Sequence, residues 1–130
     1  MGSYLWEKYN TQMISIGFAF NQGGFQAIDG QGRGLTAFTV PPAHADTLDQ
    51  LYSTAGLPIY AIDLRKAPLN GPGSLLRSPL QTRTVGSLYD ERVPLIWFSE
   101  VAVPDAFDAM FFVDSTKIGR ASCRERVSSP

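Results

Sequence analysis

The alternation of apolar and small side chains is clearest in residues 13–20. One side of the extended chain would carry Ile14, Ile16, Phe18 and Phe20, and the other side Met13, Ser15, Gly17 and Ala19. A strand that is apolar on one face and small or apolar on the other is typical of α/β sheets, whose two faces are both covered. We therefore expect residues 13–20 to form a strand that is covered on both sides.

Residues 46–55 have the spacing of an amphipathic helix. Its buried stripe would consist of Leu48, Leu51, Tyr52 and Ala55. Asp46 can cap the N-terminus, and Asp49 completes a capping-box pattern. Gly56 suits the position after a helix end, and Pro58 prevents continuation. Residues 59–64 then predict a short buried strand, so this segment has the form of an α/β unit.

The other elements complete a mixed pattern. The sequence predicts a helix end at 3–10, a hairpin of strands 25–28 and 35–40, and strands at 95–101 and 109–113. Residues 68–73 are expected to form a loop, and 74–89 a helical turn with an irregular connection. The expected fold class is α/β, with a partial mixed β-sheet and flanking helices. Because Met1 leads almost directly into a helix and a core strand, we expect a fragment of a larger domain.

The last segment differs from the rest of the chain. Residues 117–127 resemble the translation of a short-read sequencing adapter, so we expect residues 117–130 to be an artefactual, disordered tail and residues 1–116 to be the natural part. Residues 1–116 carry seven Lys or Arg against eleven Asp or Glu, a net charge near −4. This acidity argues against a nucleic-acid partner, which a basic stripe would favour.

Composition says little about the compartment. The only cysteine, Cys123, lies in the tail and reports no disulfide. No apolar run approaches the roughly 20 residues of a membrane-spanning helix, so no membrane partner is expected. No signal peptide is visible, and a parent protein without one would be cytoplasmic.

No motif assigns a catalytic residue, a metal ligand or a cofactor to this chain. His44, the only histidine, is more often a surface or capping residue in such a position than a base. Gly30, Gly32 and Gly34 have the spacing of a dinucleotide loop, but a strand follows them, which favours a hairpin turn. The sequence has no Gly-x-Ser-x-Gly nucleophile elbow and no His/Cys cluster at zinc spacing.

Carboxylates stand at or near several expected strand ends, namely Asp63, Glu100, Asp108 and Asp114. They could do acid–base work if paired in space, or form ion pairs such as Asp63 with Arg65 or Lys66. If strands 13–20 and 59–64 are parallel neighbours, their carboxyl ends would share one edge of the sheet, where α/β proteins bind ligands. The residues then expected to line a substrate are Phe20, Asn21, Gln22, Asp63 and Arg65.

Several short motifs occur together in a characteristic order. They are Met1-Gly2-x-Tyr4-Leu5, Ile16-Gly17-Phe18-x-Phe20, Gly24-Phe25-x-Ala27, Phe38-x-Val40-Pro41-Pro42-Ala43, Asp63-Leu64-Arg65, Thr84-Val85-Gly86-x-x-Tyr89 and Phe107-Asp108-Ala109-Met110-Phe111-Phe112-Val113. In this order and spacing, residues 1–116 resemble the C-terminal third of the erythromycin esterase family.

The resemblance implies a function for the parent protein. Members of this family hydrolyse the lactone ester of macrolide antibiotics without a metal, using a histidine as general base with Glu and Arg residues nearby. Those residues precede the matching segment, so none is assigned here, and His44 matches no family histidine. The resemblance thus implies an esterase-like parent acting on a macrolide or another small ester, and a fragment that is inactive alone. The alternative is a non-catalytic scaffold or binding relative of the same fold.

Overall fold

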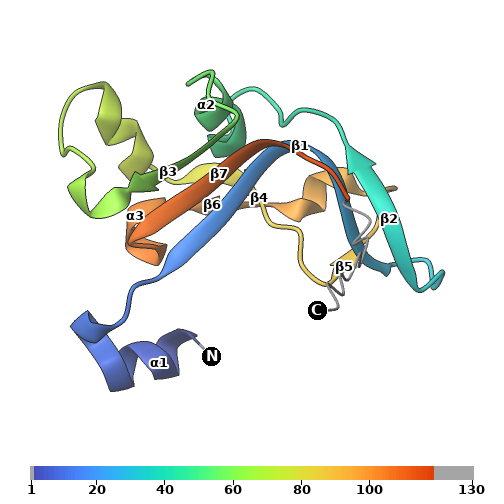
Figure 1. Ribbon diagram of the computed structural model, residues 1–130, viewed down its shortest axis with the longest axis horizontal. Coiled ribbons are helices and arrows are strands. Elements are labelled where there is room, and N and C mark those ends of the chain that lie inside the picture. The colour runs from blue at the N-terminus through green and yellow to red at the C-terminus, as the bar shows by residue number, and fades with distance from the viewer. Residues whose placement is uncertain (1, 119–130) are drawn as a thin grey trace, which may run out of the picture.

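The computed structural model describes residues 2–118 (Figure 1). The expected artefactual tail therefore lies, apart from its first two residues, outside the described part of the chain. The helices are α1 (Gly2–Tyr9), α2 (Leu48–Ser53) and α3 (Val103–Ala106), and short 3-10 turns cover Asn10–Gln12, Leu64–Lys66, Pro72–Arg77 and Pro94–Trp97. The strands are β1 (Ile16–Asp29), β2 (Leu35–Val40), β3 (Ile59–Asp63), β4 (Leu80–Arg83), β5 (Leu88–Tyr89), β6 (Phe98–Val101) and β7 (Ala109–Thr116).

The main sheet is mixed, as the sequence predicts. Its order is β2-β1-β7-β3, with β5 pairing on β1, and β4 and β6 form a separate antiparallel ribbon. The central pair, β1 and β7, is parallel, whereas β2 and β3 run antiparallel to their neighbours. Figure 1 shows β1 in blue and β7 in orange side by side along the molecule, with α1 projecting beyond the start of β1. The α/β fold class is confirmed.

Strand β1 is longer than the pattern indicates. The expected strand 13–20, from Ile16 onward, and the expected strand 25–28 belong to one 14-residue strand, which pairs with β7 in its first half and with β2 in its second. The two pairings meet at Gly23, whose φ is +114° and whose neighbour Thr116 ends β7. A Cβ at Gly23 would lie 2.1 Å from the Thr116 carbonyl oxygen. Glycine is required here because both the backbone conformation and the space exclude a side chain.

The N-terminus of α2 corrects the expected cap. Thr47, not Asp46, is the N-cap residue, and its Oγ1 accepts a hydrogen bond from the Gln50 N–H at 3.3 Å. Asp46 has a φ of +69° and lies in the preceding turn. Asp49 does not close a capping box: it is fully buried, and its carboxylate accepts hydrogen bonds from Thr82 Oγ1 and the Arg83 N–H of β4. A tertiary contact has replaced the local one.

The core lies in two clusters along the sheet. The cluster beneath α2 comprises Ala19, Leu48, Tyr52, Leu64, Val103, Met110 and Phe112. The cluster beside the β1–β2 hairpin comprises Phe20, Ala27, Phe38, Val40 and Tyr89. Tyr52 and Phe112 connect α2 to β7 through rings 5.6 Å apart. Leu48, Leu51 and Tyr52 of the helix stripe inferred from the sequence therefore pack on alternate residues of β1 and β7, whereas Ala55 is exposed in the turn after α2.

Three further expectations from the sequence are wrong. Residues 74–89, expected to form a helical turn with an irregular connection, also contain the strands β4 and β5. Strand 13–20 is not covered on both sides along its whole length: Ile16 and Phe18 are 66% and 58% exposed, whereas Phe20, on the same face, is buried in the hairpin core cluster. Residues 95–101 are not one strand either, since Pro94–Trp97 forms a 3-10 turn and only Phe98–Val101 pairs, with β4. Proline fixes the backbone of that turn and lacks an N–H for a ladder.

None of the helices within residues 2–118 combines the length and the apolar character needed to cross a membrane.

Candidate functional site

A polar cluster forms where β7 approaches its carboxyl end. The carboxylate of Asp114 accepts hydrogen bonds from Ser53 Oγ at 2.6 Å and from Asn21 Nδ2 at 3.0 Å. Ser53 ends α2, and Asn21 lies in β1. The amide oxygen of Asn21 accepts a hydrogen bond from the Ala43 N–H at 2.9 Å. Asn21 is buried and uses both ends of its side chain, so it fixes the carboxylate relative to the loop after β2.

The parallel pairing explains this meeting. Phe20 pairs with Val113 and Gln22 with Ser115, which places Asn21 beside Asp114 on neighbouring strands. Residues that share a register position on neighbouring strands point to the same face of the sheet. That face carries α2, so the helix C-terminus delivers Ser53 to the same point.

The electrostatics of the cluster favour an ionised carboxylate. The hydrogen bond from Ser53, and then that from Asn21, lower the pKa of Asp114 from its ordinary value of 3.8. Hydrogen bonds to the charged form of an acid stabilise that form. Asp114 therefore accepts hydrogen bonds well at neutral pH but is a weak base. This chemistry suits recognition of a hydroxyl or amine group rather than proton abstraction.

A hollow of about 190 Å³ adjoins the cluster. It is lined by Ser53, Gly56, Leu57, Pro58 and Asp114. The lining combines an apolar wall from the α2–β3 turn with one hydroxyl and one carboxylate. We take the Asn21–Ser53–Asp114 cluster and this hollow as the candidate binding site.

A second hollow, of about 360 Å³, lies at the opposite end of the β1–β7 pair. Its lining includes Trp6, Met13, Ser15, Phe107 and Asp108. Asp108 accepts a hydrogen bond from the Ser15 N–H at 2.8 Å and thereby ties the start of β1 to the segment before β7. This end carries the amino termini of the two parallel strands, whereas α/β sheets bind ligands beyond the carboxyl termini.

The structure separates the residues expected to line a substrate. The premise that strands 13–20 and 59–64 are parallel neighbours is wrong, because β7 lies between β1 and β3, and β3 is antiparallel to it. Asn21 and Gln22 lie near the carboxyl end of β7, but Asp63 pairs with Ala109 at its amino end. The expected lining role therefore stays a prediction for two separate groups, one of Phe20, Asn21 and Gln22 and the other of Asp63 and Arg65.

The members of those groups have distinct surroundings. Phe20 belongs to the hairpin core cluster, and the guanidinium of Arg83 lies 5.5 Å from its ring centroid. Asp63 forms ion pairs with Arg65 at 2.9 Å and with Lys66 at 3.8 Å. The hydrogen bond from Arg65 lowers the pKa of Asp63. Asp63 and Arg65 thus adopt the ion-paired arrangement that the sequence offered as one alternative.

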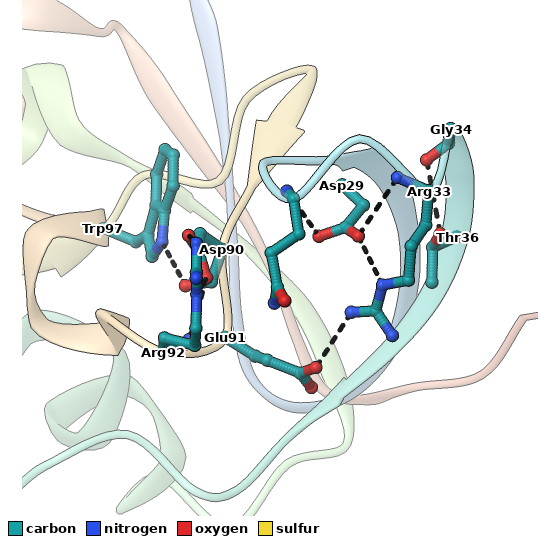
Figure 2. A network of polar contacts seen from close by, with 9 residues as sticks. Asp29, Arg33, Gly34, Thr36, Asp90, Glu91, Arg92 and Trp97 are labelled. Carbon is teal, nitrogen blue, oxygen red and sulfur yellow. Dashed lines mark hydrogen bonds and ion pairs between the residues drawn. The ribbon is translucent and has the colours of Figure 1, made fainter.

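The glycine-rich turn at residues 30–34 connects β1 and β2, as the hairpin interpretation predicts. Figure 2 shows its polar network. The Asp29 carboxylate accepts hydrogen bonds from the Gln31 N–H and the Arg33 side chain, and Arg33 Nη2 reaches Glu91 at 2.9 Å. The Arg33 hydrogen bond lowers the pKa of Asp29. The turn is therefore tied to the segment after β5.

The same network continues beside Trp97. The side chain of Arg92 holds Asp90 by two hydrogen bonds, which lower the pKa of Asp90 to about 2. Trp97 Nε1 donates a hydrogen bond to the Asp90 carbonyl oxygen at 3.1 Å (Figure 2). These charges satisfy one another and hold loop segments together.

His44 and Ser53 show what local sequence signals can miss. The His44 ring lies 5.6 Å from that of Phe98, and its carbonyl oxygen accepts a hydrogen bond from Thr47 Oγ1. Ser53 was not singled out by any motif, because its partner Asp114 is 61 residues away in the sequence.

Within residues 2–118, no group of three or more His, Cys, Asp or Glu side chains lies close enough to hold a metal ion.

Comparisons with known proteins identify relatives over nearly the whole described chain. A family model described as erythromycin esterase matches residues 1–116. A Bacillus cereus protein of known crystal structure superposes with a TM-score of 0.75 at 19% identity, covering 89% of this chain and 28% of that one. A protein described as a succinoglycan biosynthesis protein superposes with a TM-score of 0.73 at 17% identity, covering 89% and 27%. No curated protein sequence matches. The chain spans less than a third of the length of these solved structures, and at such identities they show a shared fold.

Proposed function

Since the chain belongs to the erythromycin esterase family, we propose that it is the C-terminal part of an ester hydrolase of that family. In this proposal the parent protein opens the lactone ester of a macrolide or a related small ester. The chain contributes the back half of the sheet and one wall of the substrate cleft. The observation that carries the proposal is the family match over residues 1–116.

The chemistry of the described residues supports a division of labour. Ester hydrolysis by a general base needs that base, an orienting carboxylate and a polarising group around one water. Ser53 and Asp114 form a hydrogen-bonded pair, but the low pKa of Asp114 makes it a poor base. His44 lies against the ring of Phe98 instead. We assign the base and the polarising groups to the remainder of the family domain, with no metal or cofactor.

The Asn21–Ser53–Asp114 cluster is the proposed contribution of this chain to binding. An ionised carboxylate beside an apolar hollow can accept a hydrogen bond from a hydroxyl of a macrolide-like substrate. Asn21 fixes the Asp114 carboxylate by a hydrogen bond. Gln22, the next residue of β1, also lowers the pKa of Asp114. Phe20, the residue before Asn21, packs in the hairpin core cluster.

The test follows ring opening of erythromycin by mass spectrometry. The proteins compared are this chain, its His44→Ala variant and the longer gene product read from the flanking DNA. We expect turnover only by the longer product, unchanged by His44→Ala. Turnover by the chain alone that vanishes in His44→Ala would contradict the proposal.

The binding role needs its own comparison in the longer product. Ser53→Ala and Gln22→Ala should raise KM more than they lower the melting temperature, because they remove substrate contacts at the edge of the fold. Glu100→Gln, at an exposed position on β6 outside the candidate site, is the control and should leave KM unchanged. Equal loss of stability with unchanged kinetics would assign Ser53 and Gln22 to the fold.

The second candidate is a non-catalytic scaffold or binding relative of the same fold. The modest size of the hollow at Asp114, about 190 Å³, is compatible with this function as well. A longer product that binds erythromycin without opening it, and whose sequence has no histidine general base, would favour the scaffold over the hydrolase.

A further inference from the structure

One face of the main sheet carries an uncovered apolar surface. Register pairs Phe18 of β1 with Phe111 of β7, and Phe111 with Ala61 of β3, so the three side chains lie in one row across the sheet. Ile16 and Ile59 flank this row on the same face. We call Ile16, Phe18, Ile59, Ala61 and Phe111 the open face.

The exposure of the open face is large for aromatic and branched side chains. Phe18 is 58% exposed, Phe111 40% and Ile59 59%. The rings of Phe18 and Phe111 stack with their centroids 6.1 Å apart, so they form one continuous apolar surface. A contiguous apolar patch of this kind marks an interaction site.

The opposite face of the same strands shows what normally covers such a sheet. The intervening residues Ala19, Met110 and Phe112 are buried beneath α2 and the neighbouring turns. A parallel pair of strands in an α/β fold is covered on both faces. On the side of the open face, Phe20 and Val113 pack in the hairpin core cluster, so the open face is the part of that side that the described residues leave uncovered.

The dimensions of the open face fit one helix. Three neighbouring strands about 4.8 Å apart span about 10 Å, which is the width of one α-helix. At the corner of the open face next to β3, Asp63 is already paired with Arg65 and Lys66. An occupant with an apolar stripe along the strands would meet this surface without burying an unpaired charge.

The solved structures of the same fold are much longer than this chain. This chain covers only 28% and 27% of their lengths, so most of each neighbour consists of further polypeptide. We propose that the open face is the docking surface for an amphipathic helix from the remainder of an erythromycin-esterase-family domain. The inference rests on the proposed function only in treating this chain as one part of such a domain.

Paired variants test the surface. Phe18→Lys with Phe111→Glu places a charge pair in the middle of the open face. The matched control is Ile28→Lys with Leu35→Glu, another exposed apolar register pair, at the β1–β2 hairpin. Circular dichroism establishes that each variant of the full chain keeps its fold.

The occupant is tested with the polypeptide encoded upstream in the same gene, co-expressed as a separate chain. We expect affinity capture of that polypeptide to fall about tenfold or more in the Phe18/Phe111 variant and to be unchanged in the Ile28/Leu35 variant. Helical segments protected from hydrogen exchange on association should include the docking helix.

Three outcomes would overturn the proposal. One is capture that is equally strong in both variants. Another is a gene with no upstream coding sequence. The third is a concentration-dependent dimer of this chain that Phe18→Lys/Phe111→Glu dissociates while capture is unaffected, which would assign the face to a second copy. Complex formation without ester hydrolysis would retain the docking surface and remove only the proposed function.

Discussion

Asn21 and Asp114, 93 residues apart in the sequence, are joined by a 3.0 Å hydrogen bond from the Asn21 amide to the Asp114 carboxylate. The bond connects the two parallel strands at the centre of the sheet. Ser53 donates to the same carboxylate oxygen, so one acceptor connects β1, β7 and α2. Stability and the proposed binding role therefore depend on the ionised state of a single side chain.

Asp114 should make the protein less stable in acid. Its folded pKa is below the ordinary value of 3.8, so its contribution is present above that value and is lost as pH falls through the folded pKa. Asp114→Asn should lower the free energy of unfolding by about 1 kcal/mol at pH 7. It should also flatten the fall in stability below pH 3.8. Urea unfolding between pH 7 and pH 2 measures both effects.

Glu100→Gln, at an exposed position on β6, is the control for Asp114→Asn and should leave the dependence of stability on pH unchanged. Identical pH profiles of stability for Asp114→Asn and the wild type would contradict the prediction.

Asp49 should have the opposite pH dependence. Burial raises its pKa above 3.8, so its favourable contribution is complete below that value and is lost as pH rises through the folded pKa. Asp49→Asn keeps an acceptor for the Arg83 N–H and should remove this loss. Asp49→Ala leaves Thr82 Oγ1 and the Arg83 N–H without their acceptor and should cost about 2–3 kcal/mol. Thermal unfolding at pH 4 and pH 7 separates the two variants, and equal stability of Asp49→Ala and wild type would exclude this anchoring role.

Substitution can show whether Thr47 or Asp46 caps the N-terminus of α2. Thr47→Ala should lower the free energy of unfolding by about 1 kcal/mol, because the Gln50 N–H loses its acceptor. Asp46→Gly should be neutral or slightly stabilising, since glycine adopts the positive φ of that position without strain. Chemical denaturation measures both changes. A loss in Asp46→Gly as large as that in Thr47→Ala would restore Asp46 as the cap.

Gly23 should tolerate substitution far less than Gly32. Both have positive φ, but a Cβ at Gly23 meets the Thr116 backbone, whereas a Cβ at Gly32 meets nothing within 4 Å. Gly32→Ala should cost about 1 kcal/mol of backbone strain. Gly23→Ala should cost several times more, or prevent folding, because β1 and β7 must separate to admit the methyl group. Similar melting temperatures for the two variants would show that the strands can shift freely.

The sequence by itself determined part of the local structure and the family. The hairpin of β1 and β2 follows from a glycine-rich turn between apolar runs, and the end of α2 follows from Gly56 and Pro58. The ordered motifs of residues 1–116 identified the family that the comparison confirms. These features depend on neighbouring residues or on a linear order, which a sequence displays directly.

Only the tertiary structure decided which distant residues meet. Strand order depends on pairing across the whole chain, and the insertion of β7 between β1 and β3 sends Asp63 and Asn21 to opposite ends of the sheet. Burial depends on which elements are present to cover a surface, so the apolar side of residues 13–20 could not be known to be open at Phe18. Asp49 was available for a local cap and for a buried contact with β4, and packing of the helix against that strand selected the contact. The alternation of side chains along a strand indicates which face of the strand is apolar, but not which element packs against that face.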